Sequence, residues 1–483
     1  MSTKTWQDPK PARVTYDDWA RLFEDVPDEL LDRYHYYRED QERSGGLKPW
    51  SAYMFPPQTF AVYGARHLKR LKFDNSLAAL RMWGFVQNET ERLYRARQVG
   101  RRVVATMGDL GAVPVIVNSF PGATAFYPDC IWWMPFVMES NVLFDAAAGL
   151  GIGDATCFSR AALGAFDKHA YFPEPDLVVA STGASCDDYS GVEQLAGRFA
   201  AEMLWVESPC RRERLGCHAC GEDLAETVDS GTPYEPESLA FLVTEYERVK
   251  ETMERLTGHR TSEEELRAGV RKANRVRRLT RRVRELAYRD GALPSLEAMV
   301  VEFGNLHHYA DIDEWPEVLE HLVETCEERG RKGETVVDRD ALRLVWVTPP
   351  ADPLFLNYLE DQGARVVGTE YVIGQALELL DEDRPPLEAV AESFMAASLT
   401  GSTRQRTEAA IRQAREHDAD GVIISGILGG SHCAMESRLI ARYVKAELDL
   451  PVLEFDVPPP AKEISRQIRT RIDAFLEVLR GRR

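Results

Sequence analysis

The chain of 483 residues is too long for one hydrophobic core of ordinary size, so two or three domains are expected. Hydrophobic residues make up 44% of the chain and charged residues 28%, which is typical of a soluble globular protein. The formal net charge of −19 argues against a nucleic-acid-binding function, because that function needs a basic surface. No segment has the pattern of a signal peptide or the length of a membrane span, which predicts a cytoplasmic protein without membrane contact.

The first half of the chain changes from a helical to an alternating pattern. The first 100 residues are rich in Trp, Tyr, Arg and Glu, and residues 75–102 carry apolar side chains at helical spacing. Short β-branched runs then follow at 113–117, 176–181 and 203–206, each with a loop and a helical segment after it. Continuous apolar strands that alternate with helices predict a parallel sheet covered on both faces.

From 231 to 340 the pattern is again helical. One apolar stripe at helical spacing consists of Leu239, Leu242, Tyr246, Val249, Met253 and Leu256. Gly258 is placed to end that helix, and Ser262 with Glu265 predicts a capping box for the next one. A basic run follows, made of Arg271, Lys272, Arg275, Arg277, Arg278, Arg281, Arg282 and Arg284. We interpret this run as a solvated or subunit-facing helix surface, with an approach path for an anionic ligand such as coenzyme A as the alternative.

Strand-like runs return in the last third of the chain, at 342–347, 364–367, 421–424 and 451–455. The predicted fold class is α/β, with two Rossmann-like lobes built on parallel sheets and with N-terminal and central helical segments. The predicted boundaries are 1–100 for the N-terminal helical region, 101–230 for the first lobe, 231–340 for the central helices and 341–483 for the second lobe. Open parallel sheets bind ligands beyond the carboxyl ends of their strands, so a substrate is expected in the cleft between the lobes.

Three of the eight cysteines share a local setting. Cys186 follows the run at 176–181 in a loop of small residues, and Cys433 repeats this arrangement in the second half of the chain. Cys157 follows a glycine-rich turn and opens a helical segment. Small residues let the backbone approach a metal cluster and direct N–H groups toward its sulfur atoms. Spacing alone leaves two interpretations open, buried structural cysteines or metal ligands, since disulfides are rare in the cytoplasm.

A second group of cysteines is denser in sequence. Cys210, Cys217 and Cys220, with the neighbouring His218, have the ligand types of a zinc site or a second cluster. The alternative is a loop without metal, because only half of a zinc-ribbon spacing is present. Cys130 and Cys326 are expected to be core residues, Cys326 in a helical segment.

At these residues the chain resembles the iron–sulfur subunits of the 2-hydroxyacyl-CoA dehydratase and benzoyl-CoA reductase family. The matching stretches, in the order that the family has them, are 153–164 (GDATCFSRAALG), 173–179 followed by Cys186, 246–266, 420–424 followed by Cys433, and 451–456. The similarity covers about residues 100 to 483. The chain departs from the family at 117–124 (VNSFPGAT), where no glutamate follows the proline of a Pro-x-Glu-Leu element.

The resemblance implies a low-potential radical enzyme that works under anaerobic conditions. Cys157, Cys186 and Cys433 become the ligands of one [4Fe–4S] cluster, whose fourth iron has no cysteine and is open to the substrate. The implied substrate is an acyl-CoA thioester, and the reaction is either 2-hydroxyacyl-CoA dehydration or benzoyl-CoA-type ring reduction. The implied partners are a homologous second subunit and an ATP-dependent iron–sulfur activator. The sequence has no G-x-x-x-x-G-K-[ST] loop, so ATP use is expected in the activator.

Ser119 and His432 are the candidate catalytic residues, and His432 is equally well interpreted as a structural loop residue. Two other functions remain open. The chain could be an electron-relay or accessory iron–sulfur subunit that has no substrate of its own. It could also be a cluster-free Rossmann-like transferase, for example of nucleotide sugars.

Overall fold

The computed structural model describes most of the chain. The described residues are 6–34, 69–129, 140–154, 156–182, 186–209, 234–307, 309–348, 353–370, 377–397, 400–427, 431–457 and 464–483. Within these ranges, none of the helices has the length and apolarity needed to cross a membrane.

The first lobe is built on a four-stranded parallel sheet. Its strands are β3 (Arg102–Thr106), β4 (Ala123–Phe126), β5 (Leu177–Ser181) and β6 (Met203–Val206), in the spatial order β4-β3-β5-β6. Successive residues of a strand face opposite sides, and both sides are buried: Val179 packs in one apolar cluster and Val178 in another. Burial on both faces explains why these strands are continuous apolar runs.

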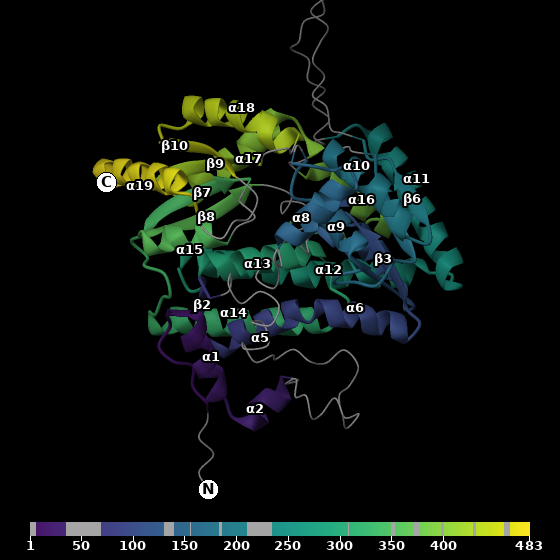
Figure 1. The fold of residues 1–483 in the computed structure, drawn as a ribbon, viewed down its shortest axis with the longest axis horizontal. Coiled ribbons are helices and arrows are strands. Elements are labelled where there is room, and N and C mark those ends of the chain that lie inside the picture. Colours follow the sequence, from purple (N-terminus) through teal and green to yellow (C-terminus); the bar gives the residue numbers. More distant parts are fainter. Residues whose placement is uncertain are drawn as a thin grey trace, which may run out of the picture.

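The second lobe repeats this topology. Its strands are β7 (Leu342–Val347), β8 (Ala364–Glu370), β9 (Gly421–Ile427) and β10 (Val452–Val457), all parallel, in the order β10-β9-β7-β8. Counted from the first strand of each lobe, both sheets have the order 2-1-3-4. The predicted α/β class with two Rossmann-like lobes is confirmed, and Figure 1 shows the two sheets side by side.

Helices cover both sheets. The first lobe carries α7 (Val113–Val117), α8 (Ser140–Gly149), α9 (Arg160–Asp167) and α10 (Asp187–Ala196), with short 3₁₀ turns at Gly108–Leu110 and Gly197–Phe199. The second lobe carries α15 (Leu354–Asp361), α17 (Thr403–Glu416), α18 (Ser431–Glu447) and α19 (Arg466–Arg482). Helices α17 and α18 pack on each other and on strands of the second sheet.

The expected strand at 113–117 is wrong, because this run forms helix α7. Its sequence is VPVIV, and proline lacks the N–H that a sheet ladder needs but is tolerated in the first turn of a helix, where it lies here. All five residues are buried, so the run is apolar throughout and has no periodicity that could identify it as a helix. The true neighbouring strands, β3 and β4, were not predicted.

The central helices follow the predicted pattern. They are α11 (Pro236–Thr257), α12 (Glu263–Arg284), a π-helical turn at Glu285–Arg289, α13 (Ser295–His307) and α14 (Glu314–Lys332). Gly258 ends α11 in the left-handed conformation with φ 71°, and the Ser262–Glu265 capping box is present. Figure 1 shows α12 and α13 running across the middle of the molecule, above α14 and α5.

The basic run on α12 is largely neutralised by carboxylates. Arg275 bonds to Glu317 and Glu320, and Arg282 bonds to Glu327, all on the neighbouring α14. Two further ion pairs, Arg278–Glu382 and Arg281–Glu378, join α12 to the segment that precedes α16. The run is therefore an ion-paired helix surface that is exposed in part, with Arg277 buried.

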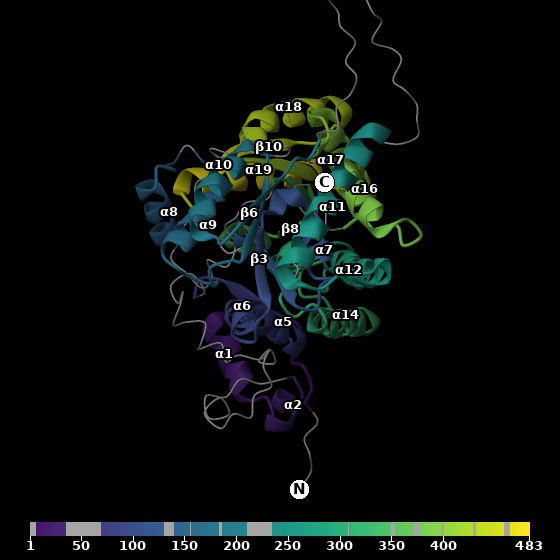
Figure 2. The same cartoon turned by 90° about the vertical axis from the view of Figure 1, so that its right-hand side faces the viewer.

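The N-terminal segment attaches to both the central helices and the second lobe. Strand β1 (Arg13–Thr15) pairs antiparallel with β2 (Lys72–Asp74), and α1 (Tyr16–Glu24), α2 (Asp28–Arg33), α5 (Leu77–Gln87) and α6 (Glu89–Gln98) complete this region. The Arg13 guanidinium lies 2.8 Å from a carboxylate oxygen of Asp361 on α15. In Figure 2 these helices form the lower part of the molecule, with α17 and α18 at the upper end.

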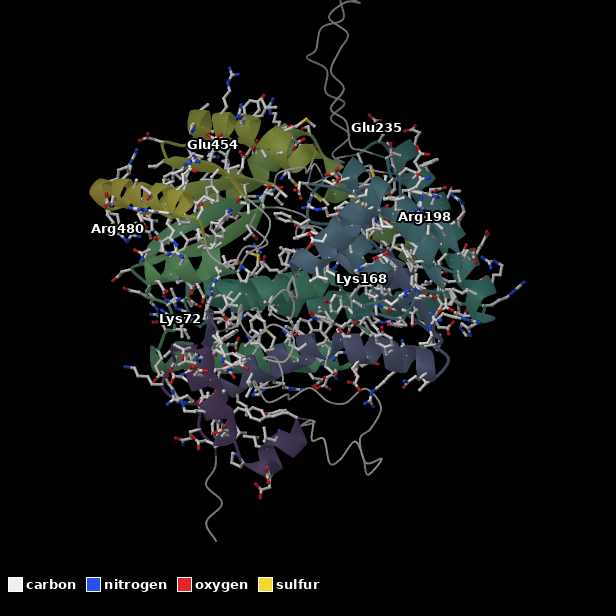
Figure 3. The ribbon with its side chains drawn as sticks, in the orientation of Figure 1. Lys72, Lys168, Arg198, Glu235, Glu454 and Arg480 are labelled. Atoms are coloured by element: carbon white, nitrogen blue, oxygen red, sulfur yellow. The ribbon has the colours of Figure 1, made fainter. Side chains whose placement is uncertain are left out.

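Two buried carboxylates lie where this segment meets the central helices. Asp74 pairs with Arg329 at 2.7 Å, and the Glu297 side chain accepts hydrogen bonds from the Asp74 backbone N–H and the Trp83 ring N–H. Burial raises the pKa of Glu297 to about 8, and the charge of Asp74 adds to the shift. Charged side chains are otherwise mostly peripheral, as Arg480 and Glu454 illustrate in Figure 3.

One helix of the second half packs on the first lobe. Helix α16 (Pro386–Ala396) follows β8 in the chain but contacts α7, α11 and α12. Its side chains Val390, Phe394 and Met395 are buried in the same apolar cluster as β3 and β5 of the first lobe. The first lobe is therefore completed by residues from beyond β8.

Candidate functional site

The carboxyl edges of the two sheets form the frame of the candidate site. In each lobe the strand order reverses between the first and third strands, which are β3 and β5 in one and β7 and β9 in the other. Ligands of open α/β sheets bind at such switch points, beyond the carboxyl ends of the strands. Cys186 follows β5, and Cys433 follows β9 in the first turn of α18. The two cysteines therefore occupy equivalent positions of the repeated topology.

Cys186 is the N-cap residue of α10 and is buried. It packs in one apolar cluster with Met107, which directly follows β3, so its side chain lies at the switch point of the first lobe. Nearby, the buried Asp129 accepts hydrogen bonds from the Tyr189 hydroxyl at 3.0 Å and from the Gly108 backbone N–H at 3.2 Å. These bonds fix α10 to the loops that follow the first and second strands.

The Cys157 loop is held by polar contacts around the thiol. The Cys157 Sγ lies 2.9 Å from the Ser159 hydroxyl oxygen and accepts a hydrogen bond from the Ser159 backbone N–H at 3.4 Å. The buried Arg160 donates to the backbone carbonyls of Thr156 and Cys157 and pairs with Asp154 at 2.8 Å. Backbone N–H groups directed at sulfur are the arrangement that stabilises a thiolate or an iron–sulfur cluster.

Cys157 and Cys433 lie within electrostatic range of each other, although they come from different lobes. Burial raises the pKa of the Cys157 thiol to about 12; the Ser159 hydrogen bonds oppose this shift, while Asp188 and Cys433 add to it. Without a bound cation the thiol is therefore protonated at neutral pH. A metal group would supply the positive charge that a thiolate needs here.

A buried arginine fixes the helix that carries Cys433. Arg406 on α17 bonds to both carboxylate oxygens of Glu370 at the end of β8, at 2.8 and 3.1 Å. It also donates to Glu436, one turn after Cys433, at 2.8 Å. Arg406 and Glu370 have side-chain exposures of only 1% and 2%, so this network is strongly desolvated. It was not predicted, because its members come from three elements far apart in the sequence.

The structure describes four cysteines, Cys157, Cys186, Cys326 and Cys433, and none of them forms a disulfide with another described residue. No set of three or more His, Cys, Asp and Glu side chains among the described residues is gathered tightly enough to hold a metal ion. Cys186 and Cys433 thus lie at the switch-point edges of their lobes, and Cys157 lies within electrostatic range of Cys433. Cys326 is fully buried in α14, which confirms its expected core position.

The structure separates Ser119 from these cysteines. Its hydroxyl donates to the Val115 carbonyl at 2.8 Å, and it packs against Gly269 of α12. It precedes the amino end of β4, which is the opposite edge of the sheet from Cys186, so it does not join the candidate site. His432 lies in the first turn of α18, but its side chain is outside the described residues, as are Cys130, Cys210, Cys217 and Cys220.

The sequence matches a known protein family and is similar to a known protein. Residues 140–479 match the family described as 2-hydroxyglutaryl-CoA dehydratase, D-component, which is more than half of the chain. The chain belongs to this family. It is also 24% identical over 324 residues to "Putative dehydratase subunit YjiM" of Escherichia coli (strain K12), across 65% of this chain and 77% of that protein.

The match to the D-component family includes the three cysteines of the candidate site and the whole sheet of the second lobe. It begins at α8, includes Cys157, Cys186 and Cys433, and extends into α19. It leaves out β3 and β4, which belong to the same sheet as β5, and the N-terminal helices. The recognised resemblance to the dehydratase family is confirmed.

Proposed function

We propose that this chain is the [4Fe–4S]-bearing subunit of a 2-hydroxyacyl-CoA dehydratase, with Cys157, Cys186 and Cys433 as the cluster ligands. The observation that carries the proposal is the repeated 2-1-3-4 topology, in which Cys186 and Cys433 follow the third strand of their lobes. Membership of the D-component family and the similarity to a protein named as a dehydratase subunit support dehydration over ring reduction.

The donor set fits a cluster better than a single ion. One ion needs all its ligands around one point, with sulfur about 2.3 Å from a zinc ion. Each cysteine of a cluster binds a different iron, so the thiols stand further apart. None of the three described thiols is in a disulfide, two of the three are buried, and Cys157 already accepts a backbone N–H bond. Three such ligands leave one iron without a cysteine.

When bound, the cluster would supply an open Lewis-acid iron and one-electron transfer. The chain's own residues hold the ligands in place around it. Arg160 orders the Cys157 loop, the Asp129–Tyr189 bond fixes α10 beside Cys186, and Arg406 fixes α18 beside Cys433.

The proposal includes partners. The words "component" and "subunit" in the descriptions of the family and the relative support a second, homologous subunit in the working enzyme. We infer that electrons come from an ATP-dependent iron–sulfur activator, because the sequence offers no phosphate-binding loop of its own. The acyl-CoA thioester is the proposed substrate.

Iron and acid-labile sulfide analysis of anaerobically purified protein tests the cluster. About four irons per chain are expected from one [4Fe–4S] cluster, with most of this iron lost in Cys157→Ser, Cys186→Ser and Cys433→Ser. Cys326→Ser is the matched control, since Cys326 is a buried thiol in a helix away from the site, and it should keep its iron. Iron retained in all three variants, or absent after anaerobic reconstitution, would reject the ligand assignment.

Substrate binding is tested separately. The iron-loaded chain is titrated with a 2-hydroxyacyl-CoA thioester and, as a control, with free coenzyme A, and binding is followed by calorimetry. Tighter binding of the thioester supports a substrate-bearing subunit. A full iron content without thioester binding would identify an electron-relay subunit instead.

A further inference from the structure

Helix α18 exposes an apolar stripe to solvent. Met435, Leu439 and Tyr443 are spaced four residues apart, so they lie along one face of the helix. Their exposed fractions are 71%, 45% and 44%, whereas Ile440 and Val444 on the opposite face are buried. Single exposed apolar residues are ordinary, but three in a row on one helix face form the kind of surface that binds another protein.

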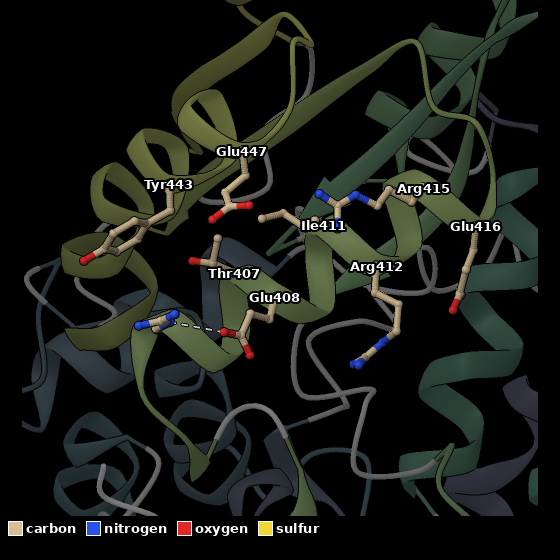
Figure 4. Close-up of a pocket in the computed structure, with 9 residues that line it drawn as sticks. Thr407, Glu408, Ile411, Arg412, Arg415, Glu416, Tyr443 and Glu447 are labelled. Carbon is tan, nitrogen blue, oxygen red and sulfur yellow. Dashed lines mark hydrogen bonds and ion pairs between the residues drawn. The ribbon is translucent and has the colours of Figure 1, made fainter. Parts of the chain in front are cut away.

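The stripe borders a groove between α17 and α18. This groove has a volume of about 580 Å³, and Tyr443 belongs to both the stripe and the groove. In Figure 4, Tyr443 and Glu447 come from α18, while Ile411, Arg412 and Arg415 come from α17 on the other side. A partner that covers the stripe therefore meets a hollow beside it, where its side chains can be received.

Several charged residues around the stripe have no ion-pair partner among the described residues. Among the described residues, Arg412, Arg415, Arg438 and Arg442 form no ion pair, although the basic run on α12 is largely matched to glutamates. Two acidic residues of the groove, Glu416 and Glu447, also lack an ion pair in this part of the chain. At this surface, unpaired positive charge thus exceeds unpaired negative charge, although the net charge of the chain is −19.

We propose that the α17–α18 surface, defined by the stripe and these four arginines, docks a protein partner with an apolar centre and an acidic rim. Charge complementarity selects this occupant: an acidic partner is repelled by most of the chain and attracted at this surface, which also orients it. A second copy of the chain is a poorer fit, because it would bring the same unpaired arginines against each other. The proposal goes beyond the proposed function and does not depend on it.

The position of this surface gives docking a route to the candidate site. Met435 is two residues after Cys433, in the first turns of the same helix, whose start is fixed by Arg406 and Glu436. A partner bound to the stripe therefore contacts the helix that carries Cys433.

Site-specific photo-crosslinking in the cells that make the protein tests the proposal. A benzophenone amino acid replaces Leu439 in the full chain, and Val478 on α19, which is 55% exposed, is the matched control position. Mass spectrometry identifies the crosslinked protein and segment. The Leu439 probe should capture one other protein through a segment rich in Asp and Glu, and the Val478 probe should not.

Charge reversal then tests the acidic rim. Arg438→Glu with Arg442→Glu should reduce the crosslink, and the affinity of the purified pair, at least about tenfold, with binding that weakens as salt increases. Arg198→Glu with Arg331→Glu changes the net charge equally at distant exposed positions and should have little effect. Crosslinks to a second copy of the chain, equal yields after charge reversal at α18, or no crosslink would each overturn the proposal. Iron content should stay at the wild-type value in every variant, which separates this test from that of the cluster.

Discussion

Removal of the Arg406 guanidinium should strongly destabilise the second lobe. In Arg406→Met the carboxylate of Glu370, which is only 2% exposed, loses both of its bonds to Arg406. Breaking a buried pair from one side costs about 3–5 kcal/mol, because the remaining charge loses its cationic partner in a medium of low polarity. Glu436 adds less, since its side chain is 23% exposed and water can replace the lost bond.

Unfolding in guanidinium chloride measures this cost. Tryptophan fluorescence is a suitable signal, because the buried Trp346 lies on β7, next to β8. Arg406→Met should lower the free energy of unfolding by about 3–5 kcal/mol, while Arg404→Met on the same helix should change it by about 0.5 kcal/mol. Arg404 is the matched control, since it pairs with Glu408 at the surface with 71% of its side chain exposed.

A double variant separates the charge effect from the loss of packing. Arg406→Met with Glu370→Met removes both members of the buried pair, and such replacements are often neutral. Most of the lost stability should therefore return. A loss below about 1 kcal/mol in Arg406→Met, or no recovery in the double variant, would contradict a buried ion pair that holds α17, α18 and β8 together.

The other predictions concern a titrating group, a helix contact and a helix cap. The pKa of Glu297 is raised to about 8 in the folded state, so its contribution to stability is full below pH 4.5 and is lost as pH rises toward 8. The stability advantage of wild type over Glu297→Gln should therefore fall with rising pH across this range, by up to about 1.4 kcal/mol per pH unit; an advantage that is independent of pH would contradict it. Gly164→Ala should lower the stability of the protein by about 1–3 kcal/mol, because the added Cβ would overlap the Leu143 carbonyl oxygen where α8 and α9 pack together. Gly191→Ala on α10 is the control, since its Cβ meets no other atom, and thermal unfolding should show a neutral or stabilising effect. Ser262→Ala should cost about 1 kcal/mol through loss of the capping box of α12, and hydrogen exchange should be faster only in the first turn of that helix.

The sequence predicts the fold where burial leaves a distinctive pattern. Strands β5, β6 and β7 are mostly apolar runs that include Val or Trp, and the sequence predicts their bounds to within a residue. Strand β4 has the sequence ATAF, with two alanines, and carries no comparable signal. Helix α7 shows the opposite error, since a short run of buried valines has strand propensity while proline and tertiary packing make it helical.

The candidate site could be predicted only in part. That Cys186 and Cys433 follow strands can be deduced from local pattern alone. The electrostatic coupling of Cys157 with Cys433 cannot, because it depends on how the two lobes pack. The Arg406 network has the same origin, since Glu370, Arg406 and Glu436 meet only after three elements have packed. The sequence favours Ser119 only through its neighbours in the chain, and the fold carries it to the other edge of the sheet.

The position of α16 bears on how the chain emerges from the ribosome. All strands of the first lobe and its covering helices α7, α11 and α12 are made before residue 290, yet the helix that seals this face is Pro386–Ala396. During translation the nascent first half must therefore keep an apolar surface open to water until β7 and β8 have also been synthesised. The two halves are interdependent folding units, and a fragment that stops before α16 leaves the first lobe with an uncovered, aggregation-prone face.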